Sequence, residues 1–528
     1  MDQRFVAGEH REPDESAMRN RHYDVVVLGG DLAGILCAAL VAKRGFRVLV
    51  LGQGALPPTY SIGGFTFPRA PHTFLSAHSS IARRVLAELA MGQLFRRRAC
   101  QMDPSFQLAM PEHRVDAVND PALLDREFAR EFPSVRRAGV DLHKLVERVG
   151  TELEEVLGRD FIWPPSTFLE RREFARATAH RVFDREGGGF DPFAEFPESH
   201  PIRRLIQAPA AFATHMDAAE LSPLARLRLY QSWWQGSAKL EGGYSWLHDA
   251  LLERIRTNSG DVRMDERADS IITKRNVATG VVLADTAEEI GAGFVIGGVD
   301  IAAVESMLPD RTMFAELFER FGEPRPRHLR YTLNIVAKDD AFPVGMGRDS
   351  FSIFDSGGAT HGENLLRLEA SPPDGTGVRK LCVEALLPRR GVEEIDRYLD
   401  GVRERILGAV TELAPFFGDQ IIAVDSPHDG RDLQHFAERK TIASDAPWTR
   451  GPSTMQRVHG FPVMGSLGVN ALPVRTPVRN LLLCNRQVSP GLGEEGEFLA
   501  AGAAAEIITR SDRRKSWMRR GLFNRVEV

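Results

Sequence analysis

Cysteine is scarce in this sequence. The 528 residues include 4 cysteines, which lie far apart and are never spaced as C-x-x-C. This spacing argues against a disulfide framework and against a zinc site, and we expect no bound metal. It also favours a reducing compartment.

Long apolar runs and a strong net charge are absent as well. No stretch approaches the roughly 18 consecutive apolar residues of a membrane span, and residues 1–21 lack the apolar core of a signal peptide. The net charge is -5, from 67 basic and 72 acidic residues, so no global positive field indicates a nucleic-acid partner. We therefore expect a cytoplasmic protein, with membrane contact that is peripheral at most.

The clearest pattern in the sequence is a strand, a glycine turn, a helix and a second strand between residues 23 and 52. A short apolar run, typical of a buried parallel strand, leads into Gly29, Gly30 and Gly34. Such a βαβ unit brings backbone N–H groups and a helix N-terminus up to a dinucleotide pyrophosphate. Asp31, however, stands in place of the second glycine of G-x-G-x-x-G.

Similar α/β patterns recur later in the chain, separated by other material. We expect a discontinuous Rossmann-type domain from residues 22–75, 236–305 and 475–510. Helices and strand-like alternating segments in residues 76–235 and 306–474 predict an interleaved α+β substrate domain with an antiparallel sheet. The sequence texture predicts mostly helices in the first of these two stretches. The fold class is therefore α/β.

Five motifs, in the same order along the chain, resemble those of one superfamily. They are VVVLGGDLAG, GGFTFPRAPHTF, EGGYSWLHDALLERIRTNSGDVRM, ATGVVLADTAEEIGAGFVIGGVD and RTPVRNLLLCNRQVSPGLGEEGEFLAAGAAAE. In these motifs the chain resembles the FAD-dependent amine oxidase and phytoene desaturase superfamily, which includes carotenoid isomerases and retinol saturases. The resemblance covers most of the chain, from Asp24 to Thr509.

The resemblance implies an FAD-dependent oxidoreductase. It would move a hydride between the flavin and a C–C or C–N bond of a hydrophobic small molecule. The first block would hold the ADP half of FAD in an FAD-binding domain, and the closing motif, which keeps its glycines, would lie against the flavin. The implied cofactor-binding residues are Gly29, Gly30, Gly34, Gly63, Gly64, Pro490, Gly491, Gly493, Glu495 and Gly496.

Three residues depart from the family pattern, all on the side that would hold ADP. Asp31 places a carboxylate where the pyrophosphate needs bare backbone; two charges about 4 Å apart interact by roughly 1 kcal/mol in water-like surroundings, and more when partly buried. Gly52 stands where an acidic residue would hold the ribose hydroxyls. Phe65 replaces an arginine that usually faces the phosphates. The alternative is therefore a flavin-free homologue that acts as a binding or scaffolding protein.

Catalytic residues are harder to predict, because the flavin itself does most hydride chemistry. His72 lies where the family approaches the flavin, and it would serve as an acid or a base near pH 7. A turn histidine bonded to backbone is the alternative interpretation. His428 and His459 are candidates on no better grounds.

Two more features have competing interpretations. Tyr230, Trp233 and Trp234 either line a tunnel for a long apolar substrate or pack in a helical core. Cys37, in the first helix, is expected to be a buried inert thiol.

The two ends of the sequence read as tails. Residues 1–21 predict a flexible tail, and residues 511–528 form a basic tail that also carries large apolar residues. A helix over 511–526 would place apolar residues on one face, as in peripheral membrane contact. A solvated or partner-bound tail is the alternative.

Overall fold

The computed structural model of the chain describes residues 22–159, 161–179, 192–197, 200–373, 375–395, 397–461 and 466–511. The two predicted tails lie outside the described residues, apart from Ser511. The predicted membrane contact through the basic tail lies outside them too. Within the described ranges, no helix is both long and apolar enough to cross a membrane.

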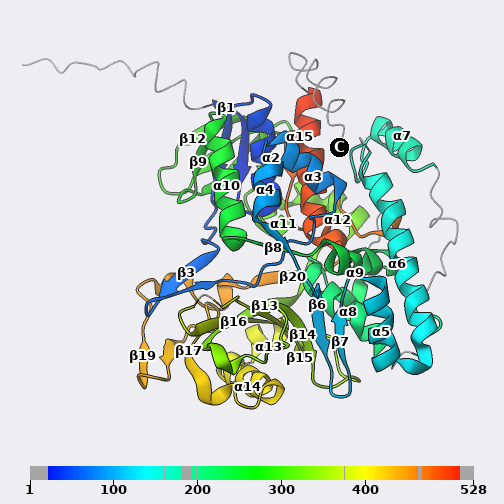
Figure 1. Cartoon of the computed structure of the whole chain (residues 1–528). Coiled ribbons are helices and arrows are strands. Elements are labelled where there is room, and N and C mark those ends of the chain that lie inside the picture. Colours follow the sequence, from blue (N-terminus) through cyan, green and yellow to red (C-terminus); the bar gives the residue numbers. More distant parts are fainter. Residues whose placement is uncertain are drawn as a thin grey trace, which may run out of the picture.

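The first of two large sheets has a parallel centre (Figure 1). Its parallel strands follow the order β9 (Asp261–Arg263), β2 (Val48–Leu51), β1 (His22–Leu28), β12 (Glu289–Gly297) and β21 (Leu481–Leu483). Two antiparallel strands, β10 (Ala268–Lys274) and β11 (Val277–Leu283), extend it beside β12. Three separated stretches of sequence thus build one Rossmann-type sheet, and the predicted α/β fold is confirmed. The exact domain boundaries stay a prediction.

The centre of this sheet is buried on both faces. Val25, Val26 and Val27 of β1 are fully buried, which explains their uninterrupted apolar run. Three helices cover the sheet region, with α10 (Gly243–Thr257) and α15 (Gly493–Ser511) both packed on α2 (Leu32–Lys43). Because α2 is buried on nearly every side, its sequence is apolar all round instead of amphipathic.

The second sheet is mostly antiparallel and lies below the first in Figure 1. Its strand order is β19 (Lys440–Ile442), β18 (Leu433–His435), β17 (Ile421–Asp425), β13 (Arg325–Lys338), β16 (Val378–Pro388), β15 (Gly362–Ala370), β14 (Asp349–Ile353), β6 (Phe106–Ala109) and β7 (Arg114–Ala117), with β20 (Gln456–Gly460) beside β13. The strands β6 and β7 come from a stretch expected to be mostly helical. They form because Phe106, Leu108, Val115 and Ala117 alternate with more exposed residues, which suits a sheet edge.

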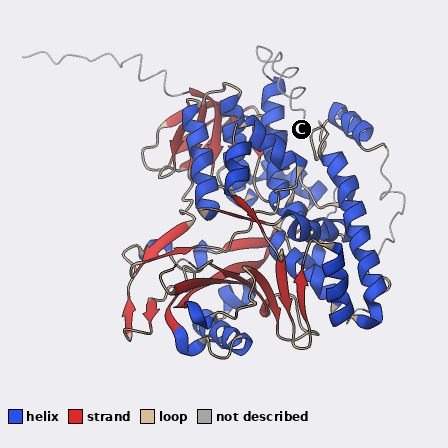
Figure 2. Cartoon of the chain, in the orientation of Figure 1, coloured by secondary structure: helices blue, strands red, loops and turns tan. Residues whose placement is uncertain are grey.

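Helices gather beside this sheet edge and over the first sheet, as Figure 2 shows. Those from the first half of the chain are α3 (Ser80–Glu88), α4 (Gly92–Arg98), α5 (Pro121–Glu131), α6 (Arg136–Leu157), α7 (Phe168–Ala177), α8 (Ile202–Ala213) and α9 (Pro223–Gly236). Later ones are α11 (Ile301–Ser306), α12 (Ala315–Phe321), α13 (Arg389–Glu394) and α14 (Tyr398–Leu413). Two small pairs, β3 (Thr59–Ile62) with β4 (Phe65–Pro68) and β5 (Ala99–Gln101) with β8 (Ala238–Leu240), connect the layers.

The aromatic residues of α9 belong to the core. Tyr230, Trp233 and Trp234 are all buried; the Tyr230 hydroxyl lies 2.5 Å from Nε2 of His143, and Trp234 Nε1 donates to the Val118 carbonyl at 2.8 Å. Core packing, not a tunnel wall, is the interpretation that these contacts support.

The thiols also follow expectation. Cys37 is buried, and the four cysteines are free.

Candidate functional site

The carboxyl ends of three parallel strands meet at one edge of the first sheet. β1 ends at Leu28, its neighbour β12 at Gly297, and β21 at Leu483. Ligands of open parallel sheets bind outside this edge, so the loops that follow these strands form the candidate site. We call residues Gly29–Asp31 the opening loop and residues Asn485–Gly493 the closing loop.

The opening loop has the backbone of a dinucleotide loop. Gly29 has φ +112°, and a Cβ there would overlap the Gly298 carbonyl and the Val299 side chain. Asp31 stands at the N-cap of α2, but its side chain makes no capping hydrogen bond. The first N–H groups of the helix are thus left without a side-chain acceptor from their N-cap, which is the arrangement that binds anions.

The carboxylate of Asp31 points instead to the closing loop. Arg486 donates to it through Nε, at 3.0 Å, and through Nη2. Burial alone would lower the pKa of Arg486, but the charge of Asp31 and its hydrogen bond raise it above its ordinary value. The repulsion of phosphate that Asp31 predicts from sequence is therefore largely cancelled by an arginine 455 positions along the chain.

Steric packing explains why residue 52 is a glycine. A Cβ at this position would overlap the backbone carbonyl of Met264, which follows β9. Gln53 then anchors the same segment, since its Nε2 donates to the Ala268 carbonyl at 3.2 Å. No acidic side chain fits at the end of β2, so a ribose would have to be held without one.

Gly63, Gly64 and Phe65 do not join the other predicted site residues. The glycines form the tip of the β3–β4 hairpin, and Phe65 packs in a small cluster with Phe67 and with residues of β18 and β19. Figure 1 shows this hairpin beside β19, away from α2. The structure does not place Gly63 and Gly64 with the other predicted cofactor-binding residues, because strand pairing carries them and Phe65 to the second sheet.

The closing loop is buried against other segments of the chain. Its turn η9 (Pro490–Leu492) is buried, and the Pro490 carbonyl accepts hydrogen bonds from Thr214 Oγ1 at 3.0 Å and from the His215 amide at 3.1 Å. A Cβ on Gly493 would overlap the Ala213 carbonyl at the end of α8, and one on Gly496 would overlap the Ser489 carbonyl. These glycines are thus required for internal packing, whatever they offer to a ligand.

Glu495 forms a buried ion pair in the core. Its carboxylate takes two bonds from the buried Arg228, at 2.9 and 2.6 Å, and one from Ser79 Oγ at 2.5 Å. Arg228 and Glu495 are 1 and 3% exposed. The structure therefore places Glu495 in a buried ion pair between α9 and α15, not at the carboxyl edge.

His72 lies near the site but does not titrate near pH 7. Burial, followed by the charges of Lys239 and Arg367, lowers the pKa of His72 to about 3. Its backbone N–H donates to Glu369 at 2.7 Å, and its ring lies 5.0 Å from the ring of Tyr244. The neutral imidazole can accept a hydrogen bond but is not an acid at neutral pH. The prediction that His72 acts as an acid near pH 7 is therefore wrong.

The other two histidines behave alike. Burial, with nearby arginines, lowers the pKa of His428 to about 3 and that of His459 to about 4. His428 Nδ1 pairs with Thr454 Oγ1 at 2.9 Å within the second sheet region. Neither histidine titrates near neutral pH.

The structure adds residues that the motifs do not single out. Arg486 is one; Tyr244, Glu494, Glu497 and His215 are the others. Burial raises the pKa of Glu494 to about 8, and His215 Nε2 lies 3.2 Å from Glu497 Oε1. The only sequence signal for Arg486 is a basic residue three positions after a buried strand, opposite in sign to Asp31.

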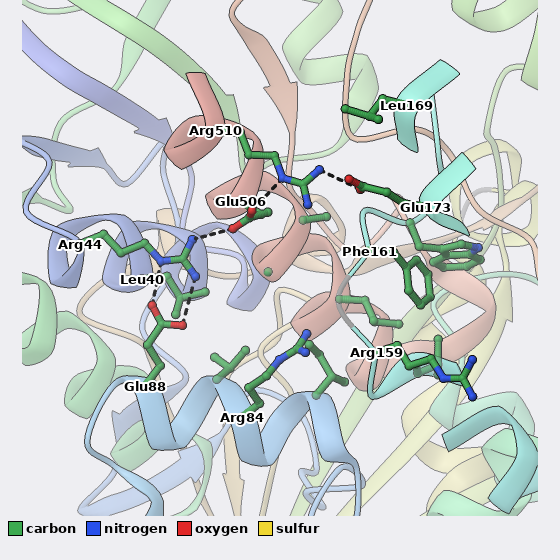
Figure 3. Close-up of a pocket in the computed structure, with 17 residues that line it drawn as sticks. Leu40, Arg44, Arg84, Glu88, Arg159, Phe161, Leu169, Glu173, Glu506 and Arg510 are labelled. Atoms are coloured by element: carbon green, nitrogen blue, oxygen red, sulfur yellow. Dashed lines mark hydrogen bonds and ion pairs between the residues drawn. The ribbon is translucent and has the colours of Figure 1, made fainter. Parts of the chain in front are cut away.

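Two cavities lie away from this edge. One of about 290 Å³ lies between α2, α3, α7 and α15, with apolar walls and Arg–Glu pairs at its rim (Figure 3). It touches α2 through Leu40 and near Arg44, at the opposite end of the helix from Asp31. Another, of about 360 Å³, lies between the second sheet and α14. Among the described residues, no cluster of three or more His, Cys, Asp or Glu is arranged to hold a metal.

Comparison with known proteins identifies the fold. Residues 27–89 match the family model of the NAD(P)-binding Rossmann-like domain. An oxidoreductase from Methanosarcina mazei has a TM-score of 0.56 at 16% identity, with 92% of this chain and 99% of that chain covered. A cofactor-binding variant of putrescine oxidase has a TM-score of 0.58 at 13% identity, with 93% of this chain and 99% of that chain covered. Cyclohexylamine oxidase from Brevibacterium oxydans has a TM-score of 0.54 at 14% identity, with 93% of this chain and 99% of that chain covered. The chain therefore has the fold of these oxidases, and the resemblance to the amine oxidase superfamily is confirmed at the level of the fold.

A short sequence match has a narrower meaning. Tetracycline 7-halogenase from Kitasatospora aureofaciens is 38% identical over 53 residues, which span 10% of this chain and 9% of that protein. A match of this length says nothing about the halogenase's activity in this chain.

The residues at the carboxyl edge fit the phosphate half of a dinucleotide. The open N-terminus of α2 and the guanidinium of Arg486 both favour an anion. Ser489 Oγ, in the closing loop, is buried and has no hydrogen-bond partner among the described residues, as expected of a polar atom that a ligand would satisfy. The ribose, by contrast, loses its usual carboxylate at Gly52.

Proposed function

We propose that this chain is an FAD-dependent oxidoreductase of the phytoene desaturase or retinol saturase type. It transfers a hydride between the flavin and a C–C or C–N bond of a hydrophobic small molecule. The observation that carries the proposal is the uncapped N-terminus of α2 beside Arg486, at the carboxyl edge of a Rossmann-type sheet. When bound, FAD supplies the hydride acceptor or donor.

Different residues of the chain would bind the pyrophosphate, position α2 and hold a proton. The backbone amides of Gly30, Asp31 and the first turn of α2, together with Arg486, would hold the pyrophosphate. Gly34 lets α2 lie close to the sheet, since a Cβ there would be 3.1 Å from Gly298 Cα. Glu494, whose pKa burial raises to about 8, keeps a proton at neutral pH and is the group in this region suited to holding one.

A second candidate keeps the fold without the flavin. The observations that favour it are the carbonyl of Met264 packed against Gly52 and the burial of the closing loop. In this alternative the chain is a binding or scaffolding protein, and the carboxyl edge serves another anion or none.

The visible spectrum of the purified protein separates the two candidates. We expect flavin absorbance in the protein as isolated, or its appearance after FAD is added and excess is removed by gel filtration. A protein that shows no flavin and fails to take up FAD would contradict the proposal and favour the second candidate. A hydride-transfer assay with hydrophobic alkenes and amines would then define the substrate bond.

A further inference from the structure

An ion pair joins the opening loop to the closing loop. Asp31 and Arg486 are 16 and 21% exposed, so both remain within reach of solvent or a ligand at the carboxyl edge. Their contact is two-pronged, with Nε at 3.0 Å from Oδ2 and Nη2 bonded to Oδ1. It therefore spans the loops after β1 and β21, on either side of the end of β12.

The pair stands where an anion would approach α2. Asp31 is the N-cap position of this helix, and its carboxylate caps none of the helix N–H groups. A pyrophosphate bound by those N–H groups would lie next to the carboxylate and next to the guanidinium. Repulsion by the carboxylate and attraction by the guanidinium would then compete at one spot.

Arg486 has hydrogen-bonding capacity left over. A guanidinium has five N–H donors in a planar fork, and Asp31 engages Nε and Nη2. In the described part of the chain, Nη1 has no hydrogen-bond partner. Asp300 and Glu497 also lie close enough to act on the charge of Arg486, so the arginine sits among three carboxyl groups, counting Asp31.

We propose that Asp31 and Arg486 form a latch over the N-terminus of α2, which a dinucleotide pyrophosphate opens by taking Arg486 from Asp31. The inference rests on the proposed function and gives it a regulated cofactor site. Phosphate oxygens suit the same planar fork as a carboxylate, so Arg486 changes partner without losing its bonds. Asp31 then turns toward solvent, and its charge sets how tightly the cofactor is held.

Two single variants test the latch from opposite sides. Asp31→Asn removes the competing charge, and we expect FAD and ADP to bind about tenfold more tightly. Arg486→Gln removes the cation and leaves the carboxylate, and we expect both ligands to bind at least about tenfold more weakly. Riboflavin, which lacks the pyrophosphate, should bind all variants alike. Binding is measured by titration calorimetry, with no catalytic assay involved.

A matched control comes from a pair elsewhere. Arg405 and Glu363 form a similar two-pronged, partly exposed pair in the second sheet region, with contacts of 2.6 and 2.8 Å. Glu363→Gln should leave FAD and ADP affinity unchanged. If Arg486→Gln fails to fold, Arg486→Lys keeps the charge without the fork, and should weaken FAD and ADP binding by a smaller factor.

The outcomes separate the latch from the proposed function. FAD binding by the native protein with affinities unchanged in both variants would overturn the latch and leave the oxidoreductase proposal standing. FAD binding only after Asp31→Asn would show that the pyrophosphate does not open the pair in the native protein, and would overturn the latch as proposed. Failure of every folded variant to bind FAD and ADP would overturn both.

Discussion

The opening loop and the closing loop are both rich in glycine, yet they use it differently. Gly29 is buried and Gly30 is half-buried, and together they lead the chain into the uncapped end of α2. Gly491 and Gly493 are buried, and the second of these packs against the last turn of α8. Glycine spacing alone therefore does not distinguish backbone offered to a ligand from backbone needed for close packing.

The sequence and the structure rank the two loops differently as cofactor-binding segments. The closing motif keeps its family glycines, while the opening motif contains Asp31. In the structure the opening loop lies at the uncapped end of α2, and Arg486 pairs with its unfavourable carboxylate. We therefore expect variants of the closing loop and its contacts to affect stability, and variants of the opening loop to affect cofactor binding.

The largest effect is expected behind the closing loop, at Arg228. Arg228→Gln leaves Glu495 buried without its cation, and we expect a loss of about 3–5 kcal/mol in the free energy of unfolding. Urea unfolding measures it. As a control, Arg405→Gln breaks the more exposed pair with Glu363 and should cost less than about 1 kcal/mol. Equal losses in both variants would show that burial does not set the difference.

The next largest loss of stability is expected at Gly493. Its φ of +56° and the Ala213 carbonyl both oppose a side chain, so Gly493→Ala should destabilise the protein by about 2–4 kcal/mol. Gly54 also has a positive φ, +76°, but no atom within 4 Å of an added Cβ. Gly54→Ala should therefore cost only about 1 kcal/mol. Thermal unfolding compares the two, and a similar shift in midpoint would contradict tight packing of the closing loop.

Glu494, the residue directly after the closing loop, gives the stability of the protein a pH dependence. Burial raises its pKa from the ordinary 4.5 to about 8 in the folded chain. The folded state then binds the proton more tightly than the unfolded state, so stability falls as pH rises from 4.5 through 8, by at most about 1.4 kcal/mol per pH unit. Glu494→Gln should remove this slope. Unfolding at pH 5, 7 and 9 (roughly spanning the shift) measures it, and identical slopes in both proteins would rule out a buried proton on Glu494.

The smallest effect is expected at the hairpin. Phe65→Arg restores the family residue, yet we expect FAD affinity to change less than about twofold, because Phe65 lies against the second sheet. Calorimetric titration with FAD tests this. A much tighter complex would mean that the hairpin moves to the carboxyl edge when the cofactor binds, and would return Gly63 and Gly64 to the site.

Local patterns predicted much of the fold and part of the site. The apolar run of β1, the turn at Gly29 and the apolar helix α2 follow from side-chain burial and backbone geometry, and the structure contains all three. The local sequence does not place the β3–β4 hairpin, which pairs Thr59–Ile62 with Phe65–Pro68. Whether Phe65 faced a phosphate or the residues of β18 and β19 depended on packing between segments more than 350 positions apart.

The pKa of His72 illustrates the same limit. A histidine in a turn has an ordinary pKa, and only its surroundings shift it. Burial and the neighbouring charges of Lys239 and Arg367, both distant in sequence, lower the pKa of His72 to about 3.

The sequence by itself determined that a Rossmann-type βαβ unit forms, because the order of apolar, glycine and apolar segments is a local property. It also determined that a carboxylate stands at the phosphate loop. Only the tertiary structure decided what that carboxylate does, because the parallel pairing of β1, β12 and β21 brings Arg486 beside Asp31. Electrostatic interactions depend on distance in space, which is why a charge that looks forbidding in one loop is balanced by another across the sheet edge.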